Sequence, residues 1–183
     1  MHYILLSLLL TIAALTPARA ADWMARIADT QRVCRLSIPG THDACTGYGF
    51  LPQDTLAGNY IARTQELDIS AQWAAGVRAF DLRPDVRAVK SSDDRQSTLQ
   101  IYHGEFATQQ TFSGMFDVLR DSLRAHPTEF AIIVMQHERS EHRDGRQWQT
   151  MIDRALEANS DLLADFRPDI TVGEMRGKIL VLS

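Results

Sequence analysis

Hydrophobic and polar positions follow two different periods along the chain, which predicts strands separated by helices. Alternation with a period of two, or a continuous apolar run, predicts five strands, at residues 35–38, 77–83, 98–103, 130–135 and 177–182. Apolar residues at helical spacing predict helices at residues 22–27, 64–75, 111–125 and 148–156. Because this order builds βα units with a mostly parallel sheet, the predicted fold class is α/β.

One apolar run and two polar segments add detail to this prediction. Residues 130–135 are nearly continuously apolar, which is typical of a strand buried on both faces of a parallel sheet. Residues 47–59 and 85–96 are polar and are expected to form loops.

Side chains that can do chemistry follow one predicted strand after another. In chain order they are His42, Asp43, Asp81, Arg83, His103, Gln136 and Glu138. An active site at the C-terminal ends of several strands is typical of a (β/α) TIM-type barrel, whereas an open sheet gathers its ligand contacts at one switch point. No glycine-rich phosphate loop follows the first strand, so we favour the barrel.

The length limits how much of a barrel the chain can hold. An eight-stranded barrel usually needs about 250 residues, and here five predicted strands already occupy 183 residues. Such a chain would leave parallel strand edges open, which natural proteins avoid. We therefore expect residues 21–183 to be the N-terminal part of a catalytic barrel, with about the first five strands present.

The N-terminus and the charge bear on location and partners. Residues 3–15 are apolar and residues 18–20 form a small-x-small site, so residues 1–20 are predicted to be a signal peptide cleaved after Ala20. About 13 apolar residues are too few to span a bilayer. The net charge of −4 and the lack of a basic run argue against nucleic-acid binding. We expect a secreted or periplasmic monomer.

Cys34 and Cys45 flank the first predicted strand and the turn after it. In an oxidising compartment they could form a disulfide that ties the strand to its loop. The alternative is a pair of reduced, buried thiols, because the sequence does not give the Cα separation that a disulfide requires.

His42 and His103 suit phosphodiester cleavage if they face one cleft. Two imidazoles can act as general base and general acid near neutral pH, and Asp43 and Asp81 are candidates for orienting them. Arg83 can hold the non-bridging phosphate oxygens and stabilise charge in the transition state. A hydrolytic metal site would need more converging carboxylates or histidines, so we expect no metal and no other cofactor.

Five motifs together carry a specific resemblance. They are residues 37–43 (SIPGTHD), 76–83 (GVRAFDLR), 102–104 (YHG), 127–129 (PTE) and 176–179 (RGKI). In this order and spacing the chain resembles the X domain of phosphatidylinositol-specific phospholipase C. The resemblance covers roughly residues 23–183.

The resemblance implies a distorted barrel that cleaves phosphatidylinositol-type lipids at a membrane surface. In this family the inositol 2-hydroxyl attacks phosphorus and releases diacylglycerol and a cyclic inositol phosphate. By this likeness His42 is the general base, and His103 is the general acid, paired with Asp43. Arg83 would contact the phosphate and the attacking hydroxyl.

The same likeness assigns the remaining positions. Asp81, Gln136 and Glu138 are expected to contact the substrate. Arg83 and Gln136 stand where calcium-dependent eukaryotic relatives have carboxylates, so the chain resembles the metal-independent bacterial branch. The carboxylate that orients the base histidine in the bacterial enzymes is expected beyond Ser183, which leaves open whether this chain alone is active.

Two other functions stay open from the sequence. One is a metal-dependent glycerophosphodiester phosphodiesterase, although that family has His-Arg-Gly and Glu-x-Asp where this chain has residues 41–43 (THD) and 81–83 (DLR). The other is a secreted lipid- or inositol-binding module without catalysis.

Overall fold

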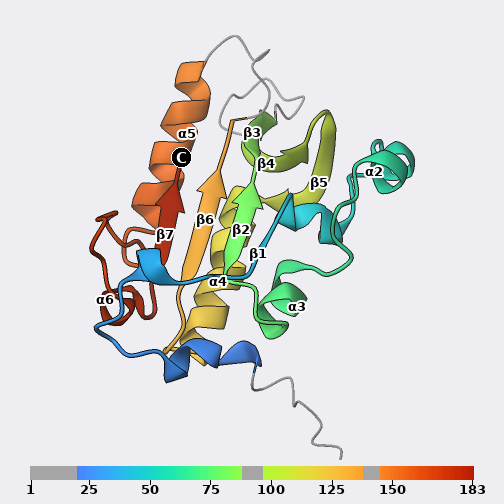
Figure 1. The fold of residues 1–183 in the computed structure, drawn as a ribbon. Helices are drawn as coiled ribbons and strands as arrows, with labels where there is room; N and C mark the ends of the chain where they lie inside the picture. Colours follow the sequence, from blue (N-terminus) through green and yellow to red (C-terminus); the bar gives the residue numbers. More distant parts are fainter. Residues whose placement is uncertain (1–19, 88–96, 138–144) are drawn as a thin grey trace, which may run out of the picture.

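The structure, a computed structural model, describes residues 20–87, 97–137 and 145–183, and its centre is a four-stranded parallel sheet. From one edge to the other the strands are β1 (Gly40–Thr41), β2 (Ala79–Leu82), β6 (Ala131–Met135) and β7 (Ile179–Leu182) (Figure 1). Because the strands are parallel, their C-terminal ends meet at the same edge of the sheet. The predicted α/β class is confirmed.

The strand predicted at residues 98–103 exists, but it does not belong to the parallel sheet. It is β4 (Thr98–His103), the centre of an antiparallel sheet with β3 (Pro84–Arg87) and β5 (Phe106–Thr111). Gly104 has a φ of +55°, which permits the short turn that pairs His103 with Phe106. Placing this strand in the barrel sheet was therefore wrong, because period-two alternation is the same in a hairpin and in a half-buried parallel strand.

Three helices cover one face of the parallel sheet. They are α3 (Ile69–Ala74), α4 (Phe112–Ala125) and α5 (Gly145–Ala158). Their apolar residues form one core with the strand residues that face them, which are Phe80, Leu82, Ala131, Ile133, Met135 and Ile179. The first two helices begin at capping side chains, since Asp68 accepts from the Ala71 N–H at 2.8 Å and Thr111 from the Gly114 N–H at 3.0 Å.

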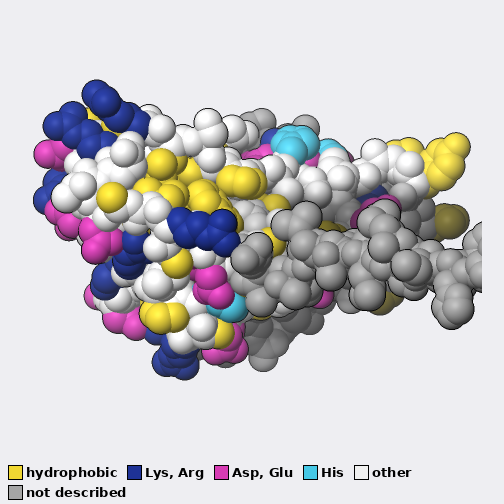
Figure 2. Space-filling view, turned by 60° about the horizontal axis from the view of Figure 1, so that its bottom comes forward, with side chains coloured by type: hydrophobic (Ala, Val, Ile, Leu, Met, Phe, Trp, Pro, Cys, Tyr) yellow, Lys and Arg dark blue, Asp and Glu magenta, His cyan; other side chains and the backbone are white. Residues whose placement is uncertain are grey.

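The opposite face of the sheet is only partly covered. Two 3₁₀ turns, Trp23–Arg26 and Val33–Arg35, and the short α6 (Val172–Met175) lie against it. They leave an apolar groove of about 530 Å³ beside Ile132 and Leu180, and Figure 2 shows hydrophobic side chains gathered on the surface. Val134 of β6 is 37% exposed. The prediction that this strand is buried on both faces is therefore wrong.

Residues 47–59, expected to be a loop, hold most of a helix. A 3₁₀ helix, Ala44–Tyr48, is followed by α2 (Thr55–Ile61), which projects from the molecule beside the antiparallel sheet (Figure 1). Only Gly58 of α2 is buried. The helix therefore packs no apolar stripe against the core, and such a stripe is the pattern by which a sequence reveals a helix.

The first strand and the helix before α4 are also shorter than predicted. The chain is extended before Gly40 but pairs with β2 only at Gly40–Thr41, not at residues 35–38. The predicted helix at residues 64–75 begins at Ile69, because Asp68 caps it there.

Of the two alternatives left open for Cys34 and Cys45, the structure shows no disulfide, and both cysteines are free thiols. Cys34 is exposed in the turn before β1, whereas Cys45 is buried just after β1.

Two sequence-based predictions fall on residues outside the described ranges. The signal peptide lies almost wholly in residues 1–19, and Glu138 lies in the gap at residues 138–144. Among the described residues, no helix is both long and apolar enough to cross a membrane.

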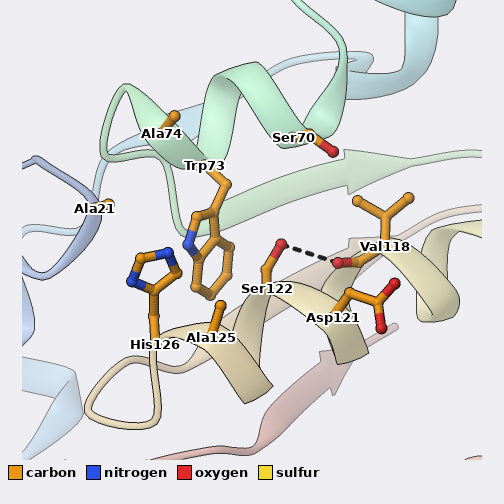
Figure 3. Close-up of a pocket in the computed structure, with 9 residues that line it drawn as sticks. All are labelled: Ala21, Ser70, Trp73, Ala74, Val118, Asp121, Ser122, Ala125 and His126. Atoms are coloured by element: carbon orange, nitrogen blue, oxygen red, sulfur yellow. Dashed lines mark hydrogen bonds between the residues drawn. The ribbon is translucent and has the colours of Figure 1, made fainter. Parts of the chain in front are cut away.

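Arg78 and Glu129, which lie just before β2 and β6, form a fully buried ion pair. Arg78 Nε lies 3.0 Å from Glu129 Oε2, and both side chains are 0% exposed. The guanidinium also stacks on Trp73, 3.8 Å from the ring centroid, and Figure 3 shows this indole between α3 and α4 beside His126. Burial lowers the pKa of Arg78 and raises the pKa of Glu129, so each charge depends on the other to stay ionised.

Replacing Glu129 with alanine should destabilise the fold strongly. The change leaves the Arg78 guanidinium buried without a counter-charge and the Met24 N–H without its acceptor, which is 3.0 Å away, so we expect a loss of about 3–5 kcal/mol. Urea unfolding followed by circular dichroism measures it. The control is Asp161→Ala, which breaks the surface pair with Arg120 and should move the midpoint far less. Equal effects of the two changes would contradict the prediction.

Candidate active site

The register between β1 and β2 brings the first two candidate residues together. Gly40 pairs with Ala79 and Thr41 with Phe80, so the next residues, His42 and Asp81, lie side by side where the strands end. His42 Nδ1 is 2.7 Å from Asp81 Oδ2. An ionised carboxylate can only accept, so Nδ1 carries a proton in this contact. Asp81 is thus a carboxylate partner of His42 within this chain, and the further carboxylate expected beyond Ser183 stays a prediction.

Asp43 is a buried carboxylate at the centre of the site. Its Oδ2 lies 3.0 Å from His42 Nε2, and its Oδ1 lies 3.2 Å from Arg83 Nε. Burial raises the pKa of the Asp43 carboxyl, although the positive charges of His103, Arg83 and His42 act against this shift. Asp43 is thus the carboxylate that the basic groups of the site approach.

The backbone at Asp43 adopts a left-handed conformation, with a φ of +46°, and no other described non-glycine residue has a positive φ. Aspartate tolerates this region better than most residues, but it still costs conformational energy. Such local strain persists where surrounding contacts enforce it, often at functional sites.

Gln72 enforces the path of this loop, and sequence reasoning missed it. Its side chain accepts from Thr41 Oγ1 at 2.7 Å and donates to the Ala44 carbonyl at 2.8 Å, so it holds both sides of residues 42 and 43. Gln65 donates to the His42 carbonyl at 2.9 Å. The one available signal was a glutamine among the apolar positions of a predicted helix.

Arg83 lies between the two carboxylates. Its Nη2 is 3.3 Å from Asp81 Oδ2, and its Nε faces Asp43. His42, Asp43 and Asp81 offer ligand atoms within 4.8 Å of one another, a donor set that could also hold a metal ion. The guanidinium already supplies a positive charge beside both carboxylates.

His103 reaches the site from the end of β4. Its ring centroid is 6.3 Å from that of His42. Its Nδ1 lies 2.6 Å from the carbonyl oxygen of Ala62 and 3.4 Å from Asp43 Oδ2. The expected pairing with Asp43 is therefore the longer contact, and a backbone carbonyl that the sequence could not reveal makes the shorter one.

Gln136 is exposed at the C-terminal end of β6. Leu82 pairs with Met135, so Gln136 follows at the same level as Arg83, and its N–H donates to the Leu82 carbonyl at 3.1 Å. It therefore lies at the edge of the sheet that carries the site. Glu138 lies outside the described residues.

The arrangement provides two imidazoles, with centroids 6.3 Å apart, and a guanidinium that contacts the same carboxylates, Asp43 and Asp81. His42 has a 61% exposed side chain and is open to a ligand, while Arg83 and His103 are 16% and 26% exposed. The fold and site together define the class: a parallel α/β barrel protein with acid–base side chains at the C-terminal strand ends.

Known proteins of similar sequence point to one family within this class. A 1-phosphatidylinositol phosphodiesterase of Listeria monocytogenes is 28% identical, with 88% of this chain and 48% of that protein covered. A protein of the same name from Staphylococcus aureus is 26% identical, with 64% and 34% covered. No family model matches the chain.

Solved structures agree with these relatives. The phosphatidylinositol-specific phospholipase C of L. monocytogenes has a TM-score of 0.71 at 28% identity, with 89% of this chain and 56% of that one covered. An S. aureus phosphatidylinositol-specific phospholipase C has a TM-score of 0.73 at 22% identity, with 88% and 52% covered, and shares the fold.

The chain is therefore similar to the bacterial phosphatidylinositol-specific phospholipases C over most of its length, and the resemblance predicted from its motifs is confirmed. The predicted partial barrel is confirmed as well, with four rather than five parallel strands among the described residues. The chain spans about half the length of the L. monocytogenes relative and a third of the S. aureus one.

Replacing Asp43 with asparagine should stabilise the protein at neutral pH. Because its folded pKa is raised, the stability linked to Asp43 is fully present while the group is protonated and is lost as the pH rises through the folded pKa. Asparagine keeps the shape, removes the charge and tolerates the left-handed backbone. Urea unfolding at pH 7 should show a gain that disappears below about pH 4, where the carboxyl of the unfolded chain is also protonated. A variant less stable than the parent at pH 7 would refute this.

Proposed function

We propose that this protein cleaves the phosphodiester of phosphatidylinositol-type lipids. The observation that carries the proposal is the pair of histidines, 6.3 Å apart, with the Arg83 guanidinium beside them. The resemblance to 1-phosphatidylinositol phosphodiesterases supplies the substrate class.

The first half of the reaction takes place at His42. Its Nε2 turns from Asp43, 3.0 Å away, to the inositol 2-hydroxyl and removes its proton, and that oxygen forms a bond to phosphorus. Asp81 holds the Nδ1 proton of the same ring at 2.7 Å, which fixes the tautomer and stabilises the imidazolium that results. Arg83 binds the non-bridging phosphate oxygens, where negative charge grows in the transition state.

The second half takes place at His103. The bond from phosphorus to the glycerol oxygen breaks, and His103 Nε2 gives that oxygen a proton. The products are diacylglycerol and a cyclic inositol phosphate, so the atoms and protons balance without a cofactor. Asp43, 3.4 Å from His103 Nδ1, stabilises the protonated ring before transfer. Gln136 and Glu138 remain predicted substrate contacts.

The substrate lies in a membrane, and α2 provides a surface to meet it. Leu56 and Tyr60 are each 89% exposed and Ile61 is 65% exposed on this projecting helix. Such a group of large apolar side chains on a protruding element is typical of contact with lipid or protein. We propose peripheral, monomeric contact with phospholipid; export by residues 1–20 stays a prediction.

Alanine at His42 or at His103 should each reduce cleavage of phosphatidylinositol vesicles by about 10²–10⁴, the range for loss of a general base or acid. Release of water-soluble inositol phosphate measures the rate. His126→Ala is the matched control, because His126 pairs with Asp22 before β6, at the other end of the sheet. Near-parental rates in either site variant would reject the assignment.

A chelator separates this mechanism from metal-dependent glycerophosphodiester cleavage. Activity that survives EDTA fits a site in which Arg83 supplies the positive charge. Activity lost in EDTA and restored by a divalent ion would instead assign His42, Asp43 and Asp81 to a metal. Inositol phosphate binding without turnover would favour a module that only binds.

Serine at both Leu56 and Tyr60 should weaken binding to phosphatidylinositol-containing vesicles by roughly tenfold or more. Burying one large apolar side chain is worth about 1.5–3 kcal/mol, and the double variant removes two such contacts. Co-sedimentation with vesicles measures the bound fraction. Asn59→Ser, an exposed polar change in the same helix, is the control, and equal binding by the parent and the double variant would exclude α2 as the lipid contact.

A further inference from the structure

We propose that α2 is a positioning element for His103, so that contact of α2 with lipid is linked to the orientation of the general acid. This inference rests on the proposed function, in which His103 protonates the leaving oxygen. It concerns a backbone group, the carbonyl of Ala62, which ends α2.

The link begins with the hydrogen bond between His103 Nδ1 and the Ala62 oxygen, 2.6 Å long. A carbonyl can only accept, so this contact requires a proton on Nδ1 and leaves Nε2 as the nitrogen that faces a ligand. The carbonyl is available because the last carbonyls of a helix have no partner within the helix. Ala62 is only 3% exposed, so few other donors can reach it.

The start of α2 is tied to the same hairpin. Asp54, which precedes the helix, accepts from the Ala107 N–H at 3.1 Å, and the Leu51 N–H donates to the Ala107 carbonyl at 2.8 Å. Ala107 pairs with Tyr102, next to His103. Both ends of α2 are therefore anchored to β4 and β5.

Between these ends the helix rests on Phe50. A Cβ atom on Gly58 would lie only 2.5–2.9 Å from carbons of the Phe50 ring, so the helix backbone and the ring are in direct contact. Phe50 is fully buried and packs edge-to-face on Phe106, with centroids 6.3 Å apart. Phe106 pairs with His103 across the turn, so packing joins α2 to the acid by a second route.

The outer face of the same helix carries the exposed Leu56, Tyr60 and Ile61. A helix seven residues long that contacts lipid on one side and the acid on the other cannot shift without moving the Ala62 carbonyl. Lipid contact should therefore change the rate of the chemical step as well as the amount of bound enzyme.

Gly58→Ala tests the link, because its methyl group must push α2 away from Phe50. On monomeric short-chain phosphatidylinositol, below its micelle-forming concentration, we expect kcat to fall roughly 10- to 100-fold with KM little changed, as for a displaced catalytic group. The ¹⁵N NMR signals of the His103 ring should also lose the single Nδ1–H tautomer. Asn59→Ala, its exposed neighbour, should match the parent in both measurements.

The ring signals keep this inference separate from the proposed function. If the parent cleaves neither phosphatidylinositol vesicles nor the monomeric lipid, the proposed function fails. The His103 tautomer in Gly58→Ala then still decides whether α2 positions His103. Unchanged His103 signals in a folded Gly58→Ala protein would overturn the inference, whatever the activity. If that variant does not fold, Asp54→Ala, which frees the other end of the helix, should change the same signals in the same direction, and unchanged signals there would also overturn it.

A lipid surface added to the protein tests whether contact at α2 reaches His103. Phosphatidylcholine bicelles should change the His103 ring signals of the parent but not those of the Leu56→Ser, Tyr60→Ser double variant. No change in the parent, under conditions where it binds the bicelles, would show that lipid contact does not reach the acid.

Discussion

The site depends on the pairing of two short strands, β1 and β2. Pro39 accepts hydrogen bonds from the N–H groups of Arg78 and Ala79, at 3.0 and 3.1 Å, and Gly40 then lies directly against Ala79. A side chain at Gly40 would bring a Cβ to 3.2 Å from the Ala79 Cβ, so a small residue is needed for the close approach. This register places His42 beside Asp81, and a slip of one residue would point one of them away from the site.

The register also explains how few parts the site requires. His42, its carboxylate partner Asp81, the buried Asp43 and the Arg83 guanidinium all come from two consecutive strand ends, at residues 42–43 and 81–83. His103 alone arrives from a different sheet, and it needs support from outside the barrel strands. The carbonyl of Ala62 provides that support.

Sequence patterns predicted the parts of this fold in which side-chain period and burial agree. The helix at residues 111–125 and the strands around Phe80 and Ile133 were found within a few residues, because each has one apolar face against the same core. The hairpin of β4 and β5 was misplaced, because alternation does not say which partner a strand takes. The helix α2 was missed, because only Gly58 of it is buried.

The candidate site was predicted by its side chains but not by their partners. The histidines, Asp43, Asp81 and Arg83 all stood out, since these residue types rarely follow successive strands by chance. Their pairing depends on register and on backbone groups that carry no residue identity, such as the Ala62 carbonyl. Gln72 was missed for the same reason, because its role lies in what it holds and not in its own chemistry.

The left-handed backbone at Asp43 limits which residue types can occupy this position. A glutamate would preserve the negative charge, yet its longer side chain is poorly suited to a φ of +46° and to the space between His42 and Arg83. Asparagine and glycine suit the backbone but remove the charge. Aspartate alone satisfies both demands, so the conformation of one peptide unit restricts the choice of residue as tightly as the chemistry does.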